Sequence, residues 1–394
     1  MTRTIAVVTG TRADYGLLRW LMHELDAREG VTLKVIATGT HFDPAFGETW
    51  HAIRDDGFTI DARVEILGHD DSPFGVALAT AEAVRGLAHA FHDLSPDLVV
   101  VLGDRYEILA AVEAAFLMRI PVAHLHGGEI TQGALDDGIR HAVTKLSALH
   151  FVAAEEYAAR VRQLGEDPAH VFVVGAAGLD NFDRVDLISA DELGDRVGLD
   201  LSGDFIMCTQ HPETTLDVDP AAFAAPLLAA LDEFPDVKVI ISKANADAGG
   251  RALNDVYQRY ADANPHRVAL VASLGQAGYL SALAHSVAVV GNSSSGILEA
   301  PTAGTPTVNI GDRQTGRLRA PSVIDVDSDT NAIVDGIRRA MSPEMQSLAS
   351  AKKSPYGRPG VAPKIADVLA TIDLSALAVK IFRDLPAITT DTNE

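Results

Sequence analysis

The feature that most constrains this fold is a regular alternation between short apolar runs and amphipathic stretches. Apolar runs of strand length occur in both halves of the chain, at 5–8, 33–37, 98–102, 122–125, 150–152, 171–174, 205–208, 237–241, 268–271, 287–290 and 307–310. Between them, apolar residues recur at spacings of three and four, as in the stretch from Leu17 to Leu25, which is typical of amphipathic helices. This alternation predicts right-handed βαβ units, and therefore an α/β fold with mostly parallel sheets covered on both faces.

The length of the chain predicts two domains. Its 394 residues exceed the size at which a single hydrophobic core keeps growing. A boundary fits best within 175–184, after the last apolar run of the first half, so we predict an α/β domain over 1–178 and another over 179–363. A helical pattern resumes at 364–384, and by analogy with other two-domain α/β proteins we expect this helix to pack back on the first domain.

Composition excludes several classes of partner. The net charge of −22 comes from acidic residues spread along the chain, and such a surface repels nucleic acid and anionic lipid. No apolar stretch is long enough for a membrane span, and the N-terminus lacks the pattern of a signal peptide. One cysteine, Cys208, excludes a disulfide framework and a thiolate metal cluster. We therefore expect a cytoplasmic protein that binds neither nucleic acid nor membrane.

Polar and ionisable residues follow two of the apolar runs directly. The run 98–102 leads into Gly-Asp-Arg-Tyr-Glu, and the run 122–125 leads into His-Gly-Gly-Glu, with Asp-Asp-Gly-Ile-Arg-His soon after. In an open α/β sheet the ligand binds beyond the carboxyl ends of the strands. We expect the following side chains to converge there: Asp104, Arg105, His124, His126, Glu129, Asp136, Asp137, Arg140 and His141.

These residue types suit general acid–base chemistry. Carboxylates can take up or deliver protons, and His124, His126, His141 and His211 are expected to titrate near neutrality. If Asp136 caps a helix over 137–146, Asp137 and His141 share one face of that helix. At least one of the two aspartates is then only a helix cap.

The first candidate anion site is the stretch from Gly10 to Gly16, between the first strand and the first helix. Backbone amides at a helix N-terminus attract anions, and Arg12 can add a charged hydrogen bond, so we place Arg12 and Asp14 among the ligand-binding residues. The alternative is a capped helix start with Arg12 in solvent. The stretch is neither a P-loop nor a Gly-x-Gly-x-x-Gly motif, which argues against a dinucleotide cofactor.

The second candidate anion site is the turn Gly-Asn-Ser-Ser-Ser-Gly at 291–296, between a predicted strand and a predicted helix. Its small residues let the backbone close on a diphosphate, and its hydroxyls can donate hydrogen bonds. We predict ligand contacts from Asn292, Ser293, Ser294, Ser295 and Gly296, and from Arg313 after the next strand. Glu299 could accept both hydroxyls of a ribose, or could be an acid favoured by the helix dipole.

No cofactor or metal is expected. The sequence contains no His-Glu-x-x-His motif and no Cys/His ligand set, and it lacks the Gly-x-Ser-x-Gly turn of serine hydrolases.

Several motifs, in order through both halves, together resemble the hydrolysing UDP-N-acetylglucosamine 2-epimerases of sialic-acid and legionaminic-acid biosynthesis. They are Thr9–Gly16, Leu102–Glu107, His126–Glu129, Asp136–His141, Gln210–Glu213, Gly291–Gly296 and Gly311–Gln314. The resemblance implies two Rossmann-like domains in a glycosyltransferase-B-like arrangement, with UDP in a cleft between the domains. It also implies a UDP-sugar substrate, and we expect a homo-oligomer, either a dimer or a tetramer.

The resemblance further implies a mechanism in which UDP-N-acetylglucosamine and water give UDP and N-acetylmannosamine. A base removes the C2 proton, UDP leaves to form a glycal, and water and a proton then add. Asp104 and Asp136 match the acid–base set of the family, and His211 matches a histidine of the cleft. Arg12, Arg313, Ser294 and Ser295 match diphosphate contacts, and Glu299 matches the ribose-binding acid.

The chain departs from the family pattern at one position. Many members have a catalytic glutamate where this chain has His126, so either His126 or Glu129 takes that role, and we favour His126 because it keeps the backbone position. Asp137, Arg105 and His141 complete the predicted site. The alternative functions are the same reaction on UDP-2,4-diacetamido-2,4,6-trideoxyglucose and, from another class, a glycosyltransferase of similar architecture.

Overall fold

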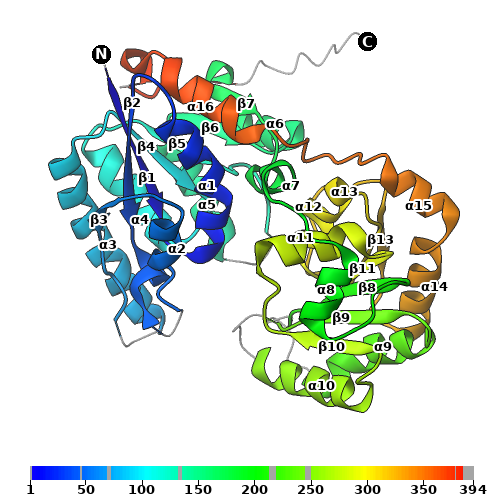
Figure 1. Cartoon of the computed structure of the whole chain (residues 1–394). Coiled ribbons are helices and arrows are strands. Elements are labelled where there is room, and N and C mark those ends of the chain that lie inside the picture. The colour runs from blue at the N-terminus through cyan, green and yellow to red at the C-terminus, as the bar shows by residue number, and fades with distance from the viewer. Residues whose placement is uncertain are drawn as a thin grey trace, which may run out of the picture. The chain divides into compact units, whose positions relative to one another are not determined.

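The computed structural model describes residues 2–44, 47–68, 72–131, 135–212, 219–244, 250–377 and 379–384. The chain forms two compact units, shown in Figure 1. The first unit comprises 1–180 and 360–394, and the second unit comprises 181–359. The sequence places these boundaries at 178 and 363, within a few residues of where the chain leaves and re-enters the first unit.

The first unit contains a seven-stranded parallel sheet with the order β3-β2-β1-β4-β5-β6-β7. Its strands are β1 (Arg3–Thr9), β2 (Val31–Ala37), β3 (Ile60–Arg63), β4 (Leu98–Leu102), β5 (Val122–Leu125), β6 (Leu149–Val152) and β7 (Val171–Val173). The direction of strand order reverses at β1, which has β2 on one side and β4 on the other. Open α/β sheets bind ligands at such a switch point.

Helices cover both faces of this sheet (Figure 1). They are α1 (Arg12–Asp26), α2 (Trp50–Asp55), α3 (Pro73–Leu94), α4 (Tyr106–Leu117), α5 (Leu135–Leu146), α6 (Glu155–Gln163) and α16 (Val361–Thr371). Side chains alternate between the two faces along a strand. Accordingly, Ile5 and Val7 of β1 pack in a core with α1 and α16, whereas Ala6 and Val8 pack in another core with α3, α4 and α5.

The second unit repeats this plan with a six-stranded parallel sheet in the order β10-β9-β8-β11-β12-β13. Its strands are β8 (Phe205–Thr209), β9 (Lys238–Ser242), β10 (Val268–Val271), β11 (Ala288–Gly291), β12 (Thr307–Ile310) and β13 (Val323–Val326). Its helices are α7 (Asn181–Arg184), α8 (Ala190–Val197), α9 (Pro220–Asp232), α10 (Gly250–Ala263), α11 (Gly275–His285), α12 (Ser294–Leu298), α13 (Ala300–Ala303), α14 (Thr330–Ala340) and α15 (Pro343–Ser350). Both predicted parallel-sheet domains are therefore confirmed.

All of the predicted apolar runs overlap strands, but two strands lie outside them. β3 and β13 are the outermost strands at one end of each sheet. Each contains a polar residue, Asp61 in β3 and Asp325 in β13, because an edge strand is less buried than a central one. A central parallel strand is buried on both faces, so its sequence is a continuous apolar run. The sequences of β3 and β13 are not continuous apolar runs, so the pattern does not predict these strands.

The C-terminal helix is shorter than the 364–384 that the sequence pattern predicts. α16 ends at Thr371, and a 3-10 turn over Leu374–Leu377 follows. The carboxylate of Asp373 accepts hydrogen bonds from the amide of Ser375 at 2.9 Å and from its hydroxyl at 2.8 Å. Local bonds of this kind compete with helical hydrogen bonds and end the helix.

Asp180 holds the start of α16 at the point where the chain re-enters the first unit. One of its carboxylate oxygens accepts hydrogen bonds from the amides of Gly360, at 2.7 Å, and Val361, at 2.8 Å. The other oxygen accepts from the amide of Ala362 at 2.6 Å. Because the first amides of a helix have no partner within the helix, this buried carboxylate satisfies and electrostatically stabilises that N-terminus.

We predict that Asp180→Ala lowers the free energy of unfolding by about 2 kcal/mol, because three amides lose a charged acceptor. Urea unfolding followed by circular dichroism measures the loss. Asp183→Ala is the matched control, since Asp183 is exposed and its removal should change stability by less than about 0.5 kcal/mol. Equal losses in the two variants would show that Asp180 does not anchor α16.

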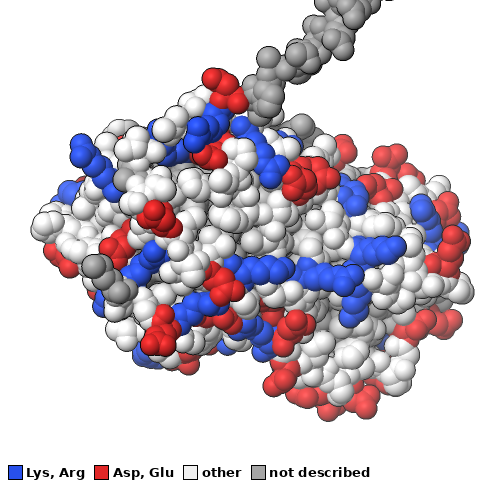
Figure 2. Space-filling view, turned by 90° about the horizontal axis from the view of Figure 1, so that it is seen from above, with Lys and Arg blue, Asp and Glu red and all other residues white. Residues whose placement is uncertain are grey.

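The excess of acidic residues lies on the surface without forming one block. Figure 2 shows Asp and Glu side chains distributed over the face in view, with Lys and Arg side chains among them. In the part of the chain that the structure describes, no helix is both long enough and apolar enough to cross a lipid bilayer.

Candidate active site

The predicted site residues of the first unit lie at or just after the ends of three adjacent strands, β1, β4 and β5, and on α1 and α5. Parallel strands bring their carboxyl ends to one edge of a sheet. The loops after these strands begin at Gly10, Gly103 and His126.

The loop after β1 is held by the buried side chain of Asp14. Its carboxylate accepts hydrogen bonds from the hydroxyl of Thr9 at 2.6 Å and from the amides of Gly10 at 2.9 Å and Thr11 at 3.1 Å. Thr11 in turn caps α1 through the amide of Asp14. Burial outweighs these bonds and raises the pKa of Asp14 to about 6. The oxygens of Asp14 thus shape the loop, whereas Arg12, the first helical residue, is exposed; ligand contacts from these two residues stay predictions.

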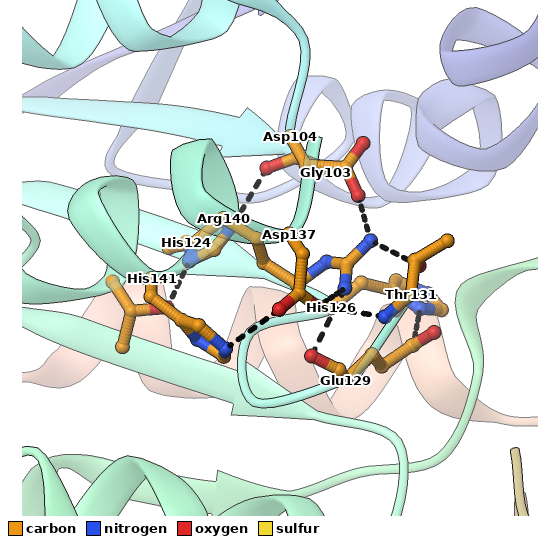
Figure 3. A network of polar contacts seen from close by, with 10 residues as sticks. Gly103, Asp104, His124, His126, Glu129, Thr131, Asp137, Arg140 and His141 are labelled. Atoms are coloured by element: carbon orange, nitrogen blue, oxygen red, sulfur yellow. Dashed lines mark hydrogen bonds and ion pairs between the residues drawn. The ribbon is translucent and has the colours of Figure 1, made fainter. Parts of the chain in front are cut away.

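Arg140 is the centre of the polar network in Figure 3. Its guanidinium is buried and donates to the carboxylates of Asp104 and Asp137, the latter at 3.4 Å. It also donates to the backbone carbonyl of Glu129 at 2.9 Å and to the hydroxyl of Thr131 at 3.0 Å. One side chain of α5 thus binds the loop after β4 and the loop after β5.

The paired aspartates differ in their surroundings. α5 begins at Leu135, so the expectation that Asp136 caps a helix starting at 137 is wrong, and both aspartates lie in the first turn. Asp137 accepts from the amide of Thr131 at 2.6 Å and lies 3.7 Å from Nε2 of His141. Among the described residues, Asp136 has neither a hydrogen-bond nor an ion-pair partner.

The pKa of Asp136 is raised. Loss of hydration is the largest cause, and the nearby carboxylate of Asp104 raises the pKa further. The guanidinium groups of Arg105 and Arg140 act in the opposite direction. A carboxylate with this balance of neighbours is suited to take up a proton and release it again.

His126 and Glu129 form a pair within the loop after β5. Nδ1 of His126 lies 2.7 Å from Oε1 of Glu129, and its Nε2 accepts from the amide of Ala177 at 3.2 Å. His126 also has a φ of 64°, a conformation that is unusual for a residue with a side chain and that occurs at functional sites. Both ring nitrogens of His126 therefore have a hydrogen-bond partner, and His126 and Glu129 form one hydrogen-bonded pair.

His124 differs from the expectation that it titrates near neutrality. It is fully buried on β5, and burial lowers its pKa to about 3. His124 therefore lies beneath the loops rather than among the groups that face a ligand.

The sequence analysis assigns no role to Glu107, although the residue ends the Gly-Asp-Arg-Tyr-Glu motif. It is fully buried in the first turn of α4 and accepts from Nε of Arg105 at 2.6 Å. A Cβ at Gly10 would lie 2.8 Å from its Oε1, so Glu107 packs directly against the loop after β1. Glu107 therefore supports the loop after β1, which its motif alone does not predict.

The second unit carries the other predicted set, centred on Asn292 after β11. The Asn292 side chain accepts from the amide of His211 at 2.7 Å and donates to its carbonyl at 2.9 Å. Its own carbonyl accepts from Arg313 at 3.1 Å and Gln314 at 2.9 Å. This side chain links the segments that follow β8 and β11, and a ligand contact from Asn292 stays a prediction. Glu213, the last residue of its motif, lies outside the described residues.

The serine turn forms a compact start to α12. Gly291 has a φ of 137°, and a Cβ there would lie 1.9 Å from the carbonyl oxygen of Thr209, so only glycine fits. Ser293 caps the helix, with its hydroxyl 3.4 Å from the amide of Ser295. The hydroxyl of Ser295 donates to Glu299 at 2.5 Å, and burial raises the pKa of Glu299. Ser294 and Gly296 complete this turn.

Comparison with known proteins assigns the family. The family profile described as UDP-N-acetylglucosamine 2-epimerase matches residues 23–370. This chain belongs to the UDP-N-acetylglucosamine 2-epimerase family. The resemblance found in the motifs is thereby confirmed.

Individual relatives within this epimerase family carry more specific names. The GDP/UDP-N,N'-diacetylbacillosamine 2-epimerase (hydrolyzing) of Campylobacter jejuni is 39% identical and aligns over 87% of this chain and 89% of its own. The UDP-N,N'-diacetylbacillosamine 2-epimerase (hydrolyzing) of Legionella pneumophila is 37% identical, and the alignment covers 87% of this chain and 90% of the relative. A crystal structure of the Neisseria meningitidis UDP-GlcNAc 2-epimerase has the same fold, with a TM-score of 0.80, 20% identity and coverage of 93% and 99%.

We predict that Arg140→Met lowers the free energy of unfolding of this epimerase by about 3 kcal/mol, because it leaves the carboxylates of Asp104 and Asp137 without their buried partner. Chemical denaturation measures the loss. Arg338→Met is the control, since Arg338 forms an exposed ion pair with Asp335 at 3.4 Å and should contribute less than about 0.5 kcal/mol. Comparable losses in the two variants would contradict a central role for Arg140.

Proposed function

We propose that this epimerase-family protein is a hydrolysing 2-epimerase of UDP-linked 2-acetamido sugars. A base removes the proton at C2 of the sugar, the bond from C1 to the UDP oxygen breaks, and a glycal forms. Water then adds at C1 and a proton returns to the opposite face of C2, which gives UDP and the free 2-epimeric sugar. The observation that carries the proposal is the contrast between Asp104, which is bound to Arg140, and Asp136, which has no partner among the described residues.

Asp136 is the proposed base. Its raised pKa brings it closer to neutral pH, where a general base combines an ionised state with useful basicity. Asp104 forms an ion pair with Arg140, and its nearby carboxylate raises the pKa of Asp136 in addition to burial. The proposed roles of the two carboxylates therefore rest on their different surroundings.

The His126–Glu129 pair is the proposed second acid–base unit. Nε2 of His126 accepts from the amide of Ala177, so Nδ1 carries the hydrogen and donates to Glu129 at 2.7 Å; because the two side chains are joined in this way, we assign the role to the pair rather than to one member. His126 keeps its orientation through the amide of Ala177.

The second unit is proposed to bind the UDP moiety. Amides and hydroxyls of the serine turn suit the diphosphate, and Arg313 stands beside that turn through its bond to Asn292. Glu299 is the proposed acceptor for ribose hydroxyls, with Ser295 orienting its carboxylate. The N. meningitidis structure was determined with UDP-GlcNAc bound, which supports a UDP-sugar as the ligand class.

The relatives favour a diacetamido sugar as substrate. The names at 39% and 37% identity specify N,N'-diacetylbacillosamine, which is a 2,4-diacetamido-2,4,6-trideoxy sugar, whereas the Neisseria relative named UDP-N-acetylglucosamine 2-epimerase is 31% identical. We therefore propose UDP-N,N'-diacetylbacillosamine as the preferred substrate and UDP-N-acetylglucosamine as the alternative. The motifs alone give the opposite order of these two substrates.

An assay without any acceptor tests this proposal. The protein is incubated separately with UDP-N,N'-diacetylbacillosamine, its GDP-linked counterpart and UDP-N-acetylglucosamine, and nucleotide and free sugar are followed by chromatography and NMR. We expect UDP and a free 2-epimeric sugar in equal amounts, fastest from the diacetamido substrate. Asp136→Asn should lower the rate by roughly 10²- to 10⁴-fold, because it removes the proton acceptor. Turnover that requires an added acceptor would instead indicate a glycosyltransferase.

The pH dependence of kcat/KM tests Asp136 as the base. Activity should fall as the pH drops through the pKa of Asp136, because protonation removes its ability to accept a proton. Arg105 lowers that pKa, so Arg105→Met should move the acid limb to higher pH. Arg85→Met, which removes an exposed arginine on α3, should leave the limb in place. A limb that moves to lower pH in Arg105→Met would overturn the assignment.

A further inference from the structure

His124 lies beneath the proposed catalytic loops and is fully buried from solvent. It stands on β5 opposite Val101 of β4 and His150 of β6. Its Nε2 is 2.9 Å from the carbonyl oxygen of Gly103, the residue before Asp104. Its Nδ1 is 3.2 Å from the hydroxyl of Thr144 on α5.

The hydrogen-bond partners determine the tautomer of His124. A carbonyl oxygen can only accept, so Nε2 must carry the hydrogen and donate to Gly103. Nδ1 then has a lone pair and accepts from the hydroxyl of Thr144. Both ring nitrogens are therefore occupied by partners from two different elements.

A third segment rests on the same two side chains. A Cβ at Gly127 would lie 3.0 Å from the hydroxyl of Thr144 and 3.1 Å from Nδ1 of His124. A side chain at this position would push against the pair, so glycine favours the close approach of the loop after β5. His124 thus contacts the loop that carries Asp104 and, through Thr144, the helix that carries Asp136, and the loop that carries Glu129 lies against both side chains. Figure 3 shows His124 beside Gly103 and Asp104.

We propose that His124, together with Thr144, is a positioning residue that fixes the Asp104 loop relative to α5 from the buried side. Arg140 links the same segments by its own bonds to Asp104 and to the Glu129 carbonyl. Arg140 holds the side chain of Asp104, and the amide of Gly103 donates to the carbonyl of Leu125 at 3.2 Å. His124 binds the carbonyl of Gly103, which belongs to the peptide that leads into Asp104. Its part in the reaction rests on the proposed function.

A direct acid–base role for His124 does not fit its surroundings. Its pKa is lowered to about 3 by burial, and the carbonyl of Gly103 does not compensate. The charged and titratable groups facing it, His150 from β6, Arg140 from α5 and His126 from its own loop, all lower the pKa further. His124 is therefore neutral throughout the pH range in which the enzyme would work.

Two substitutions at His124 separate positioning from mere packing. His124→Phe keeps a flat ring and removes the donor to Gly103, whereas His124→Gln keeps a donor near the place of Nε2. We expect kcat of His124→Phe to fall roughly 10- to 100-fold with KM little changed, because a displaced catalytic group costs rate rather than binding. His124→Gln should recover most of that loss. The pH profile should keep its wild-type shape in both variants.

Thr144→Val provides an independent variant in case His124→Phe fails to fold. It removes the hydroxyl that fixes Nδ1, and its matched control is Ser147→Ala, which removes another buried hydroxyl from the end of the same helix. Hydrogen–deuterium exchange adds a readout that needs no activity. Amides of 103–107 should exchange faster in Thr144→Val than in the wild type, and should not change in Ser147→Ala.

The outcomes distinguish this inference from the proposed function. Wild-type kcat in His124→Phe, or an equal loss in His124→Gln, would overturn the positioning role. A pH profile that loses a limb on substitution would make His124 a proton-transfer group instead. If the wild-type protein turns over none of the sugars, the proposed function fails, and hydrogen exchange then decides the structural role of His124 by itself.

Discussion

A single buried guanidinium organises the candidate active site of the first unit. Removing an arginine from water is costly, and the cost is offset only when every face of the group finds an acceptor. Arg140 finds four: two carboxylates, a carbonyl and a hydroxyl. Because these acceptors come from separate loops, the loops adopt one arrangement together. The positions of Asp104 and Asp137 therefore depend on Arg140, although Arg140 itself stands back from solvent.

Around this cation, similar carboxylates acquire different properties from their surroundings. Asp104 is paired with Arg140, whereas Asp136 has no described partner, and its pKa is raised by loss of hydration and then by the nearby Asp104. Asp14 is buried behind the loop after β1 with all its bonds directed to that loop. Burial, pairing and like-charge repulsion thus assign separate tasks to residues of the same type.

The sequence predicts this architecture well because central parallel strands are apolar on both faces, and it predicts which loops carry the site because polar residues follow those strands. The sequence could not predict which groups each side chain would bind by hydrogen bonds. The sequence predicts a ligand contact for Asn292, but not that its side-chain amide binds the backbone of His211, 81 positions away. His124 reads as a titrating group, yet burial makes it neutral. The start of α5 shifts by two residues from the predicted one. These differences arise from tertiary contacts and desolvation, which local patterns do not encode.

The carboxylate of Asp180 and the amide of Gly360 are 180 positions apart and directly bonded. In topological terms the second unit is an insertion into the first. A ribosome adding about 5–20 residues per second needs roughly 10–40 seconds to make that insertion. Throughout this interval the apolar side of α1 that packs against α16 has no cover, since α16 has not yet been synthesised. The core of the first unit is therefore incomplete until α16 has been made, although most of its residues precede the insertion.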